Sequence, residues 1–206
     1  MTNETYGGLK VACERAAAEL HGPGTSVIRP TYVIGPHDFS YRFTWWVTRI
    51  ARGGEVLAPG NPGDPIQVID ARDQASWAVS LLERGTAGIF HAVSPKPPFG
   101  FGDMLAAIAA QVAPPGTELT WVGQDYLLGS GLDENALPLW PGGDPESEIN
   151  AADPARAEAA GLAPRPLSAS IDEIRQAELE SPTPVPDGLG LSAEREAELL
   201  AGWKAR

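Results

Sequence analysis

Apolar positions along the chain alternate between a helical and a strand-like period. Between residues 3 and 20 they recur at spacings of four, three and four, which is the pattern of one helix face. The stretch TSVIRPTYVIGP that follows is rich in β-branched and aromatic residues, which predicts a strand interrupted at Pro30. The positions that form the helix face are Leu9, Cys13, Ala16 and Leu20.

The same alternation continues toward the middle of the chain. Helices are predicted for RFTWWVTRI, ended by the Gly53–Gly54 pair, for ARDQASWAVSLLERG, capped by Asp70, and for residues 102–113. Strands are predicted for PIQVID, GIFHAV and ELTWV. Strands that alternate with helices predict a parallel α/β sheet, which binds ligands beyond its strand ends. The remainder is looser, with short helices near 153–160 and 168–180, the linker SPTPVPDG and a terminal helix from Ser192.

Composition restricts the classes of function. With 206 residues, 43% apolar and 20% charged, the chain is expected to form one globular domain with appendages. Its formal net charge of -12, without a Lys/Arg cluster, makes nucleic acid and anionic membranes poor partners, so neither is expected. The single cysteine, Cys13, excludes an internal disulfide framework. Because no apolar run reaches membrane-spanning length, a cytoplasmic location is the default expectation.

One stretch fits the pattern of a dinucleotide-binding loop. Residues 188–193, GLGLSA, match G-x-G-x-x-G/A, but they follow a proline-rich linker instead of a strand. Glu194 and Glu196 would also put two carboxylates where a pyrophosphate needs the positive end of a helix. We therefore interpret the stretch as the start of the terminal helix, with Ser192 as its cap.

The sequence contains no motif that indicates a metal site or an acyl-transfer enzyme. The three histidines, His21, His37 and His91, are scattered without metal-ligand spacing, so no metal site is predicted. The sequence also contains neither a G-x-S-x-G nucleophile elbow nor a Walker phosphate loop.

Tyr6 and Lys10 are the strongest candidates for chemistry. Because they lie four residues apart on a predicted helix, they share a face, and the ammonium can approach the phenol oxygen. A neighbouring positive charge favours a phenolate, and such a pair can pass a proton to or from a hydroxyl or carbonyl group. The same spacing also occurs in ordinary surface pairs beside a core-packing face, so the neighbouring motifs have to decide between the two interpretations.

Three linked motifs supply that context: YGGLKVACE, then VIRPTYVIGPHD, then PIQVIDARDQASWAVSLLERGTAGIFHAV. In order and spacing they resemble the NAD-dependent epimerase/dehydratase family of extended short-chain dehydrogenases/reductases, and the likeness continues through LTWV, LPLW and LSAEREAELLAGW. The implied fold is α/β: the C-terminal portion of an extended Rossmann-type reductase, with the Tyr-Lys helix, the last parallel strands and the substrate-binding lobe. The implied divisions are a remnant of the Rossmann-type core with interleaved lobe elements over 1–100, mainly substrate-binding lobe over 101–180, and a linker with the C-terminal helix over 181–206.

The resemblance implies roles for matching positions. Tyr6 would be the catalytic acid/base, and Lys10 would hold the nicotinamide ribose of NAD or NADP. Gln67 and Arg72 would stand near a small-molecule substrate or hold the wall of its pocket, whereas helix capping explains Asp70 at least as well. The residues that would line the nicotinamide pocket are Pro30, Thr31, Tyr32, Val33 and Ile34.

The family pattern is incomplete in this sequence. Members begin with a strand and a glycine-rich loop that grips the cofactor pyrophosphate, and they carry a Ser or Thr well before the catalytic Tyr; neither feature precedes Tyr6. We therefore expect the C-terminal part of such an enzyme, with the glycine-rich N-terminal half elsewhere or lost. The isolated chain is expected to bind little or no dinucleotide, and to associate with a separate N-terminal half or as a homo-oligomer.

Three interpretations of the function stay open. The first is an enzyme half, in which a separate N-terminal piece supplies NAD(P) binding and redox chemistry. The second is a cofactor-independent small-molecule catalyst or binder that uses the retained substrate pocket. The third is a catalytically silent interaction module.

Overall fold

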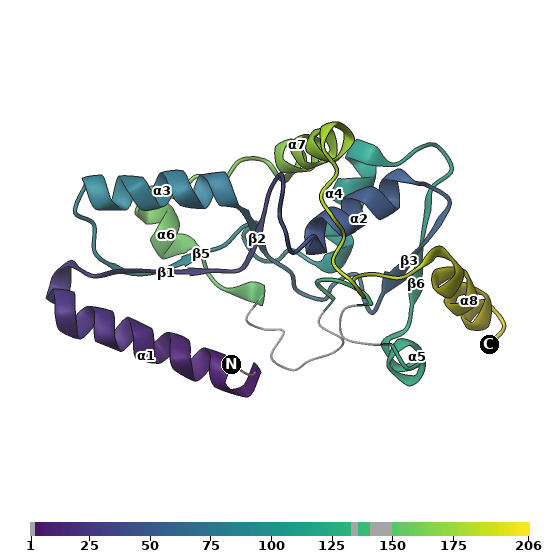
Figure 1. The fold of residues 1–206 in the computed structure, drawn as a ribbon, viewed down its shortest axis with the longest axis horizontal. Helices are drawn as coiled ribbons and strands as arrows, with labels where there is room; N and C mark the ends of the chain where they lie inside the picture. Colours follow the sequence, from purple (N-terminus) through teal and green to yellow (C-terminus); the bar gives the residue numbers. More distant parts are fainter. Residues whose placement is uncertain (1–2, 133–135, 141–149) are drawn as a thin grey trace.

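The computed structural model describes residues 3–132, 136–140 and 150–206, which form a mixed α/β fold with parallel strand pairs (Figure 1). The α/β class predicted from the alternating pattern is thereby confirmed. In chain order the described elements are α1 (Asn3–His21), η1 (Gly22–Gly24), β1 (Ser26–Pro30), β2 (Tyr32–Ile34), α2 (Arg42–Ala51), β3 (Glu55–Pro59), β4 (Val68–Asp70), α3 (Ala71–Glu83), β5 (Gly88–Ala92), α4 (Phe101–Val112), β6 (Glu118–Val122), α5 (Gln124–Gly129), α6 (Ala155–Ala159), α7 (Leu167–Glu180) and α8 (Ala193–Lys204).

The strands form three two-stranded parallel pairs instead of one continuous sheet. β1 pairs with β5, β2 with β4, and β3 with β6. The ladder of β1 ends at Pro30, which has no N–H to donate, and the Thr31 hydroxyl then donates to the Gln67 carbonyl at 2.7 Å before β2 begins. The interruption predicted at Pro30 therefore marks the place where the chain changes its strand partner.

The β1–β5 pair lies between two helical layers. α3 and α6 cover one face and α1 runs below the other (Figure 1). Phe90 and Ala92 of β5 are buried on the α3 side. The rings of Phe90 and Trp77 of α3 pack edge to face, with their centroids 5.5 Å apart. Ile89, which points the opposite way along the strand, is 43% exposed on the α1 side.

Buried apolar side chains gather in two separate clusters. The larger cluster joins β3 and β6 to α2, α4, α7 and α8, with Trp46 and Phe101 among its fully buried members. The smaller cluster lies between α3, α6 and the β1–β5 pair. Its members are Ile69, Trp77, Leu81, Phe90, Ala92, Ala157 and Leu162.

The start of α8 confirms the interpretation of GLGLSA. The Ser192 side chain caps the helix by accepting from the Arg195 N–H at 3.2 Å. Gly190, with φ of +78°, passes directly against the Trp45 indole, and a Cβ at this position would overlap the ring. Glycine is therefore needed here for close packing and a left-handed backbone, not for contact with a phosphate.

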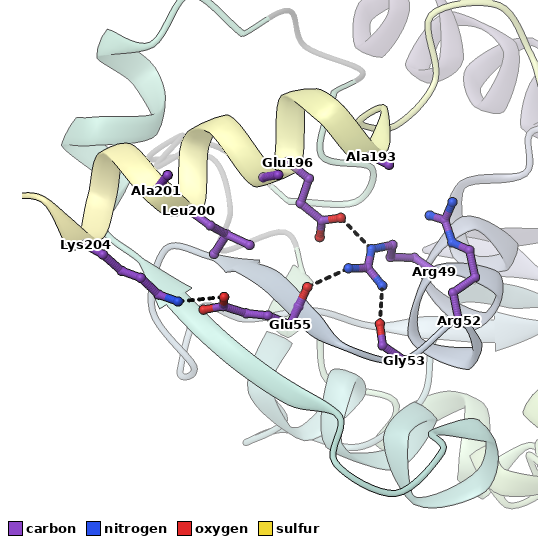
Figure 2. Close-up of a pocket in the computed structure, with 10 residues that line it drawn as sticks. Arg49, Arg52, Gly53, Glu55, Ala193, Glu196, Leu200, Ala201 and Lys204 are labelled. Carbon is purple, nitrogen blue, oxygen red and sulfur yellow. Dashed lines mark hydrogen bonds and ion pairs between the residues drawn. The ribbon is translucent and has the colours of Figure 1, made fainter.

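A buried ion pair fastens α8 to the larger cluster (Figure 2). Arg49 Nε of α2 lies 2.6 Å from Glu196 Oε2, and both side chains are less than a tenth exposed. The second carboxylate oxygen of Glu196 accepts from the Leu57 N–H of β3 at 2.9 Å. One carboxylate thus joins three elements that are distant in the sequence.

Candidate functional site

The course of α1 sets the position of Tyr6 and Lys10. The Thr25 hydroxyl, before β1, donates to the Ala17 carbonyl at 3.3 Å, whereas Arg29, near the end of β1, pairs with Glu14 at 2.6 Å. α1 is therefore antiparallel to β1, and its first turns lie toward the carboxyl end of that strand (Figure 1). Ligands of open parallel sheets bind at that edge.

Tyr6 and Lys10 meet on the surface of α1. The Lys10 Nζ lies 5.4 Å from the centroid of the Tyr6 ring, a cation–π distance, and Tyr6 is 52% exposed. The shared helix face predicted from their spacing is thus present. Neither residue lines the cavity at β2, the groove between α1 and the β1–β5 pair, or the cavity between α2 and α8.

A small cavity opens at β2, where the resemblance implies the nicotinamide pocket. Its volume is about 190 Å³, which holds one ring-sized group but is small for a whole dinucleotide. Asp38 is held in place beside it by the Ser40 N–H at 2.9 Å and the Ser40 hydroxyl at 2.8 Å. Pro30 stands outside this cavity, at the exposed end of β1. The lining residues are Thr31, Tyr32, Val33, Ile34, Asp38, Ser40, Arg42, Phe43 and Leu139.

Gln67 and Arg72 both use their polar atoms on the protein itself. The fully buried Gln67 amide donates to the Pro95 and Ala152 carbonyls at 3.1 and 3.0 Å and accepts from the Ala152 N–H at 2.9 Å. The Arg72 guanidinium binds both oxygens of Asp70, at 2.8 and 2.6 Å, and also contacts Glu173. Both side chains are thus engaged by neighbouring protein groups, and neither lines the cavity at β2.

Asp70 is the most perturbed acid among the described residues. Burial raises the pKa of its carboxyl, but hydrogen bonds from the Arg72 side chain, the Ser170 hydroxyl and the Arg72 N–H outweigh burial and lower the pKa to about 2. The carboxylate therefore stays ionised at neutral pH. It joins the end of β4 to α3 and, through Ser170, to α7.

A groove runs between α1 and the β1–β5 pair. It encloses about 450 Å³, and its lining includes Val11, Val27 and Ile89 together with the Glu14–Arg29 ion pair. Among the described residues, β1 pairs with β5 only, so its second edge has no strand beside it. Apolar side chains and an unpaired strand edge thus meet on the same side of the molecule.

Metal-binding clusters and membrane-spanning helices are both absent from the described part of the chain. No group of three or more His, Cys, Asp or Glu side chains there is arranged to hold a metal ion. None of the described helices combines the length and apolar character needed to cross a membrane.

Comparison with known proteins relates the fold to one group of enzymes. No protein-family model matches the sequence, and a search of curated proteins returns no match. Solved structures do match, and the Rossmann-like α/β fold of this chain corresponds to about half of each of them. At the identities found, all below a fifth, the likeness shows the fold alone.

Three of these structures carry nicotinamide cofactors. GDP-L-fucose synthetase of Naegleria fowleri, bound to NADP, has a TM-score of 0.58 at 17% identity, over 87% of this chain and 55% of its own. RMD of Pseudomonas aeruginosa, complexed with NADPH, has a TM-score of 0.54 at 18% identity, over 82% and 53%. WbmH of Bordetella bronchiseptica, in complex with NAD+, has a TM-score of 0.53 at 16% identity, over 80% and 48%. The chain spans about half the length of the solved chains it matches.

Some residues around the β2 cavity were not singled out from the sequence. Asp38 and Ser40 come from the turn between β2 and α2, Arg42 is the first residue of α2, and Leu139 comes from a segment distant in the chain. A local signal existed for the first two, because an Asp two residues before a Ser commonly forms a side-chain-to-backbone turn. No local signal points to Leu139.

Proposed function

We propose that the chain carries the proton-transfer pair and the nicotinamide-side pocket of an NAD(P)-dependent epimerase, dehydratase or reductase that acts on a small-molecule substrate. The proposal is supported by the antiparallel course of α1 along β1, which directs the Tyr6–Lys10 end of the helix toward the carboxyl end of β1, the end that β2 follows in the chain. The likeness of the fold to structures solved with NADP, NADPH and NAD+ bound supports it.

In this proposal Tyr6 exchanges a proton with a hydroxyl or carbonyl group of the substrate, and Lys10 holds the nicotinamide ribose and favours the phenolate. A bound nicotinamide would supply hydride transfer. Gln67 and Arg72 act on the substrate indirectly, by fixing the walls around β4. The exposed Tyr6 ring leaves its hydroxyl free to reach a substrate.

The cofactor's second half needs another piece of polypeptide. A cavity of about 190 Å³ suits a nicotinamide ring but not the pyrophosphate and adenosine. We assign these to a glycine-rich segment outside the described residues, in the same chain or in another. That segment would pair with the open edge of β1 and cover the groove below it.

Binding of reduced nicotinamide mononucleotide and of NADH, each titrated calorimetrically into the full chain, tests the proposal. If the chain contacts only the nicotinamide side, the two compounds bind with equal affinity. Lys10→Met is expected to weaken both by about tenfold, because the ribose loses its partner. Tyr6→Phe is expected to leave binding unchanged, and Arg15→Met, on the same helix, is the matched control for a lost positive charge.

Two outcomes would contradict the proposal. The nicotinamide pocket is excluded if reduced nicotinamide mononucleotide does not bind, or if Lys10→Met and Arg15→Met behave alike. Much tighter binding of NADH would show that the chain itself holds the adenosine half, and that no further segment is needed.

The β2 cavity favours a second candidate function, a cofactor-independent small-molecule catalyst or binder. Asp38 and Arg42 bring opposite charges to its lining, which suits a polar ligand without a nicotinamide. This candidate replaces the first if the nicotinamide compounds fail to bind. The exposed groove at β1 is the observation that favours the third interpretation, an interaction module without catalysis.

A further inference from the structure

A third cavity lies at the far end of α2, between that helix, β3 and α8 (Figure 2). It encloses about 480 Å³, within the range of roughly 300–1,000 Å³ that is usual for small-molecule sites. None of the residues assigned to the nicotinamide or substrate pockets lines it. It is therefore separate from the site of the proposed function.

The floor of this cavity is an ion pair whose hydrogen bonds are already made. Arg49 Nε donates to the Glu196 carboxylate. The two terminal nitrogens of the same guanidinium donate to the Gly53 carbonyl at 3.1 Å and to the Glu55 carbonyl at 2.6 Å. Glu196 uses its second oxygen on the Leu57 N–H. Because Arg49 and Glu196 neutralise each other and their hydrogen bonds are made within the protein, neither side chain needs a charged partner from a ligand.

A second ion pair closes one end. Glu55 accepts from Lys204 Nζ at 2.6 Å and from the Thr120 hydroxyl at 2.5 Å. These two contacts lower the pKa of the Glu55 carboxyl, so it stays charged and paired at neutral pH. A ligand at this end of the cavity would therefore contact the neutralised Glu55–Lys204 pair.

Arg52 differs from the other charged groups around the cavity. In the part of the chain that the structure describes, its guanidinium makes no hydrogen bond or ion pair with a neighbour. Its side chain runs beside that of Arg49 from the same end of α2 (Figure 2). Three cations and two carboxylates line the cavity, so Arg52 has no carboxylate partner within the lining, although the whole chain carries a net charge of -12.

The opposite wall is apolar and open. Ala193, Ala197 and Ala201 follow one another at intervals of four on the exposed side of α8, with the buried Leu200 beside them. Alanine side chains leave space that larger residues would fill. The wall therefore suits a flat apolar body and offers it no hydrogen-bonding side chain.

We propose that this cavity binds a small amphipathic anion, with one acidic group at Arg52 and an apolar body against the alanines of α8. The single uncompensated cation selects a monoanion over a neutral compound or a cation. A polyanion gains no further contact, because the other two cations of the lining, Arg49 and Lys204, are already paired with Glu196 and Glu55. Both walls are anchored by the Arg49–Glu196 pair, so the site is preformed.

Calorimetric titration of the full chain with 2-naphthoate, at low salt, tests this site. The neutral 2-naphthylmethanol has nearly the same apolar body and is the reference ligand. We expect 2-naphthoate to bind about tenfold more tightly than the alcohol, and added salt to reduce the difference. Arg52→Gln should lower the affinity for 2-naphthoate to that for 2-naphthylmethanol.

Further variants distinguish the contribution of the Arg52 charge to binding from that of the space in the cavity. Ala197→Trp, on the exposed side of α8, fills the cavity and should abolish binding of both compounds. Lys96→Gln removes an exposed positive charge beside the smaller cluster and should change neither affinity. Circular dichroism of each variant establishes that it is folded, and if Ala197→Trp does not fold, Arg52→Gln alone decides.

Several results would overturn the proposal. Absence of 2-naphthoate binding, equal affinity for the two compounds, or an unchanged affinity in Arg52→Gln each excludes an anion site at Arg52. If binding is lost as the protein concentration rises and the chain self-associates, a second copy fills the cavity instead, which also excludes a small-molecule site.

Discussion

Asp70 is a single buried carboxylate on which three elements depend. It caps α3 through the Arg72 N–H at 2.9 Å, binds the Arg72 guanidinium, and accepts from the Ser170 hydroxyl of α7 at 2.7 Å. The cap was predictable from the sequence because an Asp before a helical period is a local signal. The contact with Ser170 was not, because it joins residues one hundred positions apart.

The low pKa of Asp70 has a consequence for acid stability. The carboxyl has a pKa of about 2 in the folded chain and about 3.9 when unfolded, so its stabilising effect is complete above pH 4. The effect is lost as the pH falls from about 4 to about 2, and it amounts to about 2 kcal/mol. Urea unfolding between pH 7 and pH 2.5 should show this loss.

Asp70→Asn removes the charge but keeps the shape of the side chain. We expect the variant to be less stable than the native chain at pH 7 and to lose less stability on acidification. Asp172→Asn, at an exposed position of α7, is the control and should titrate like the native chain. Parallel pH curves for the native chain and Asp70→Asn would show that Asp70 does not carry the acid dependence.

At the scale of elements, α8 is held by charge as well as by apolar packing. Glu196→Gln leaves the buried Arg49 guanidinium without a counterion, so the free energy of unfolding should fall by about 3–5 kcal/mol. Glu198→Gln breaks an exposed pair with Arg195 on the same helix and should lower it by about 0–1 kcal/mol. Urea denaturation of both variants measures the difference, and equal losses would mean that the buried pair does not fasten α8.

Most helices could be predicted because their signals are local, as with Ser192 before α8 and Asp70 before α3. β3 and the short helix α5 were not predicted: for β3, residues 55–59 follow a Gly-Gly helix end, and their short apolar run carries no alternation. All but the first of these residues are buried, and the strand depends on pairing with β6, where Val56 faces Leu119. Such pairing is decided by contacts distant in sequence, as is the cavity floor formed by Arg49 and Glu196.

At the scale of the whole molecule, one side is left uncovered. α1 has exposed Leu9, Val11 and Leu20, and the groove between it and the β1–β5 pair is lined by Val11 and Ile89. Exposed apolar groups beside an unpaired strand edge favour association. In the absence of the cofactor-binding segment proposed above, we expect copies of the chain to associate through this groove.

Light scattering over a range of protein concentrations measures that association. Val11→Lys and Ile89→Lys place charges in the groove and should shift the chain toward the monomer. Leu82→Lys, at a more exposed site on α3, should leave the oligomeric state unchanged. A native chain that stays monomeric at every concentration would show that the groove does not bind a second copy.

The separation of the apolar side chains into two clusters also decides what the chain's fluorescence can report. Trp45, Trp46, Trp121, Trp140 and Trp203 all lie in or against the larger cluster, and only Trp77 belongs to the smaller one. Emission from the native chain therefore follows the larger cluster, and a loosening of α3 from β5 would change it little. Subtracting the signal of a Trp77→Phe variant gives the smaller cluster an optical probe of its own, at the side of the molecule that carries α1.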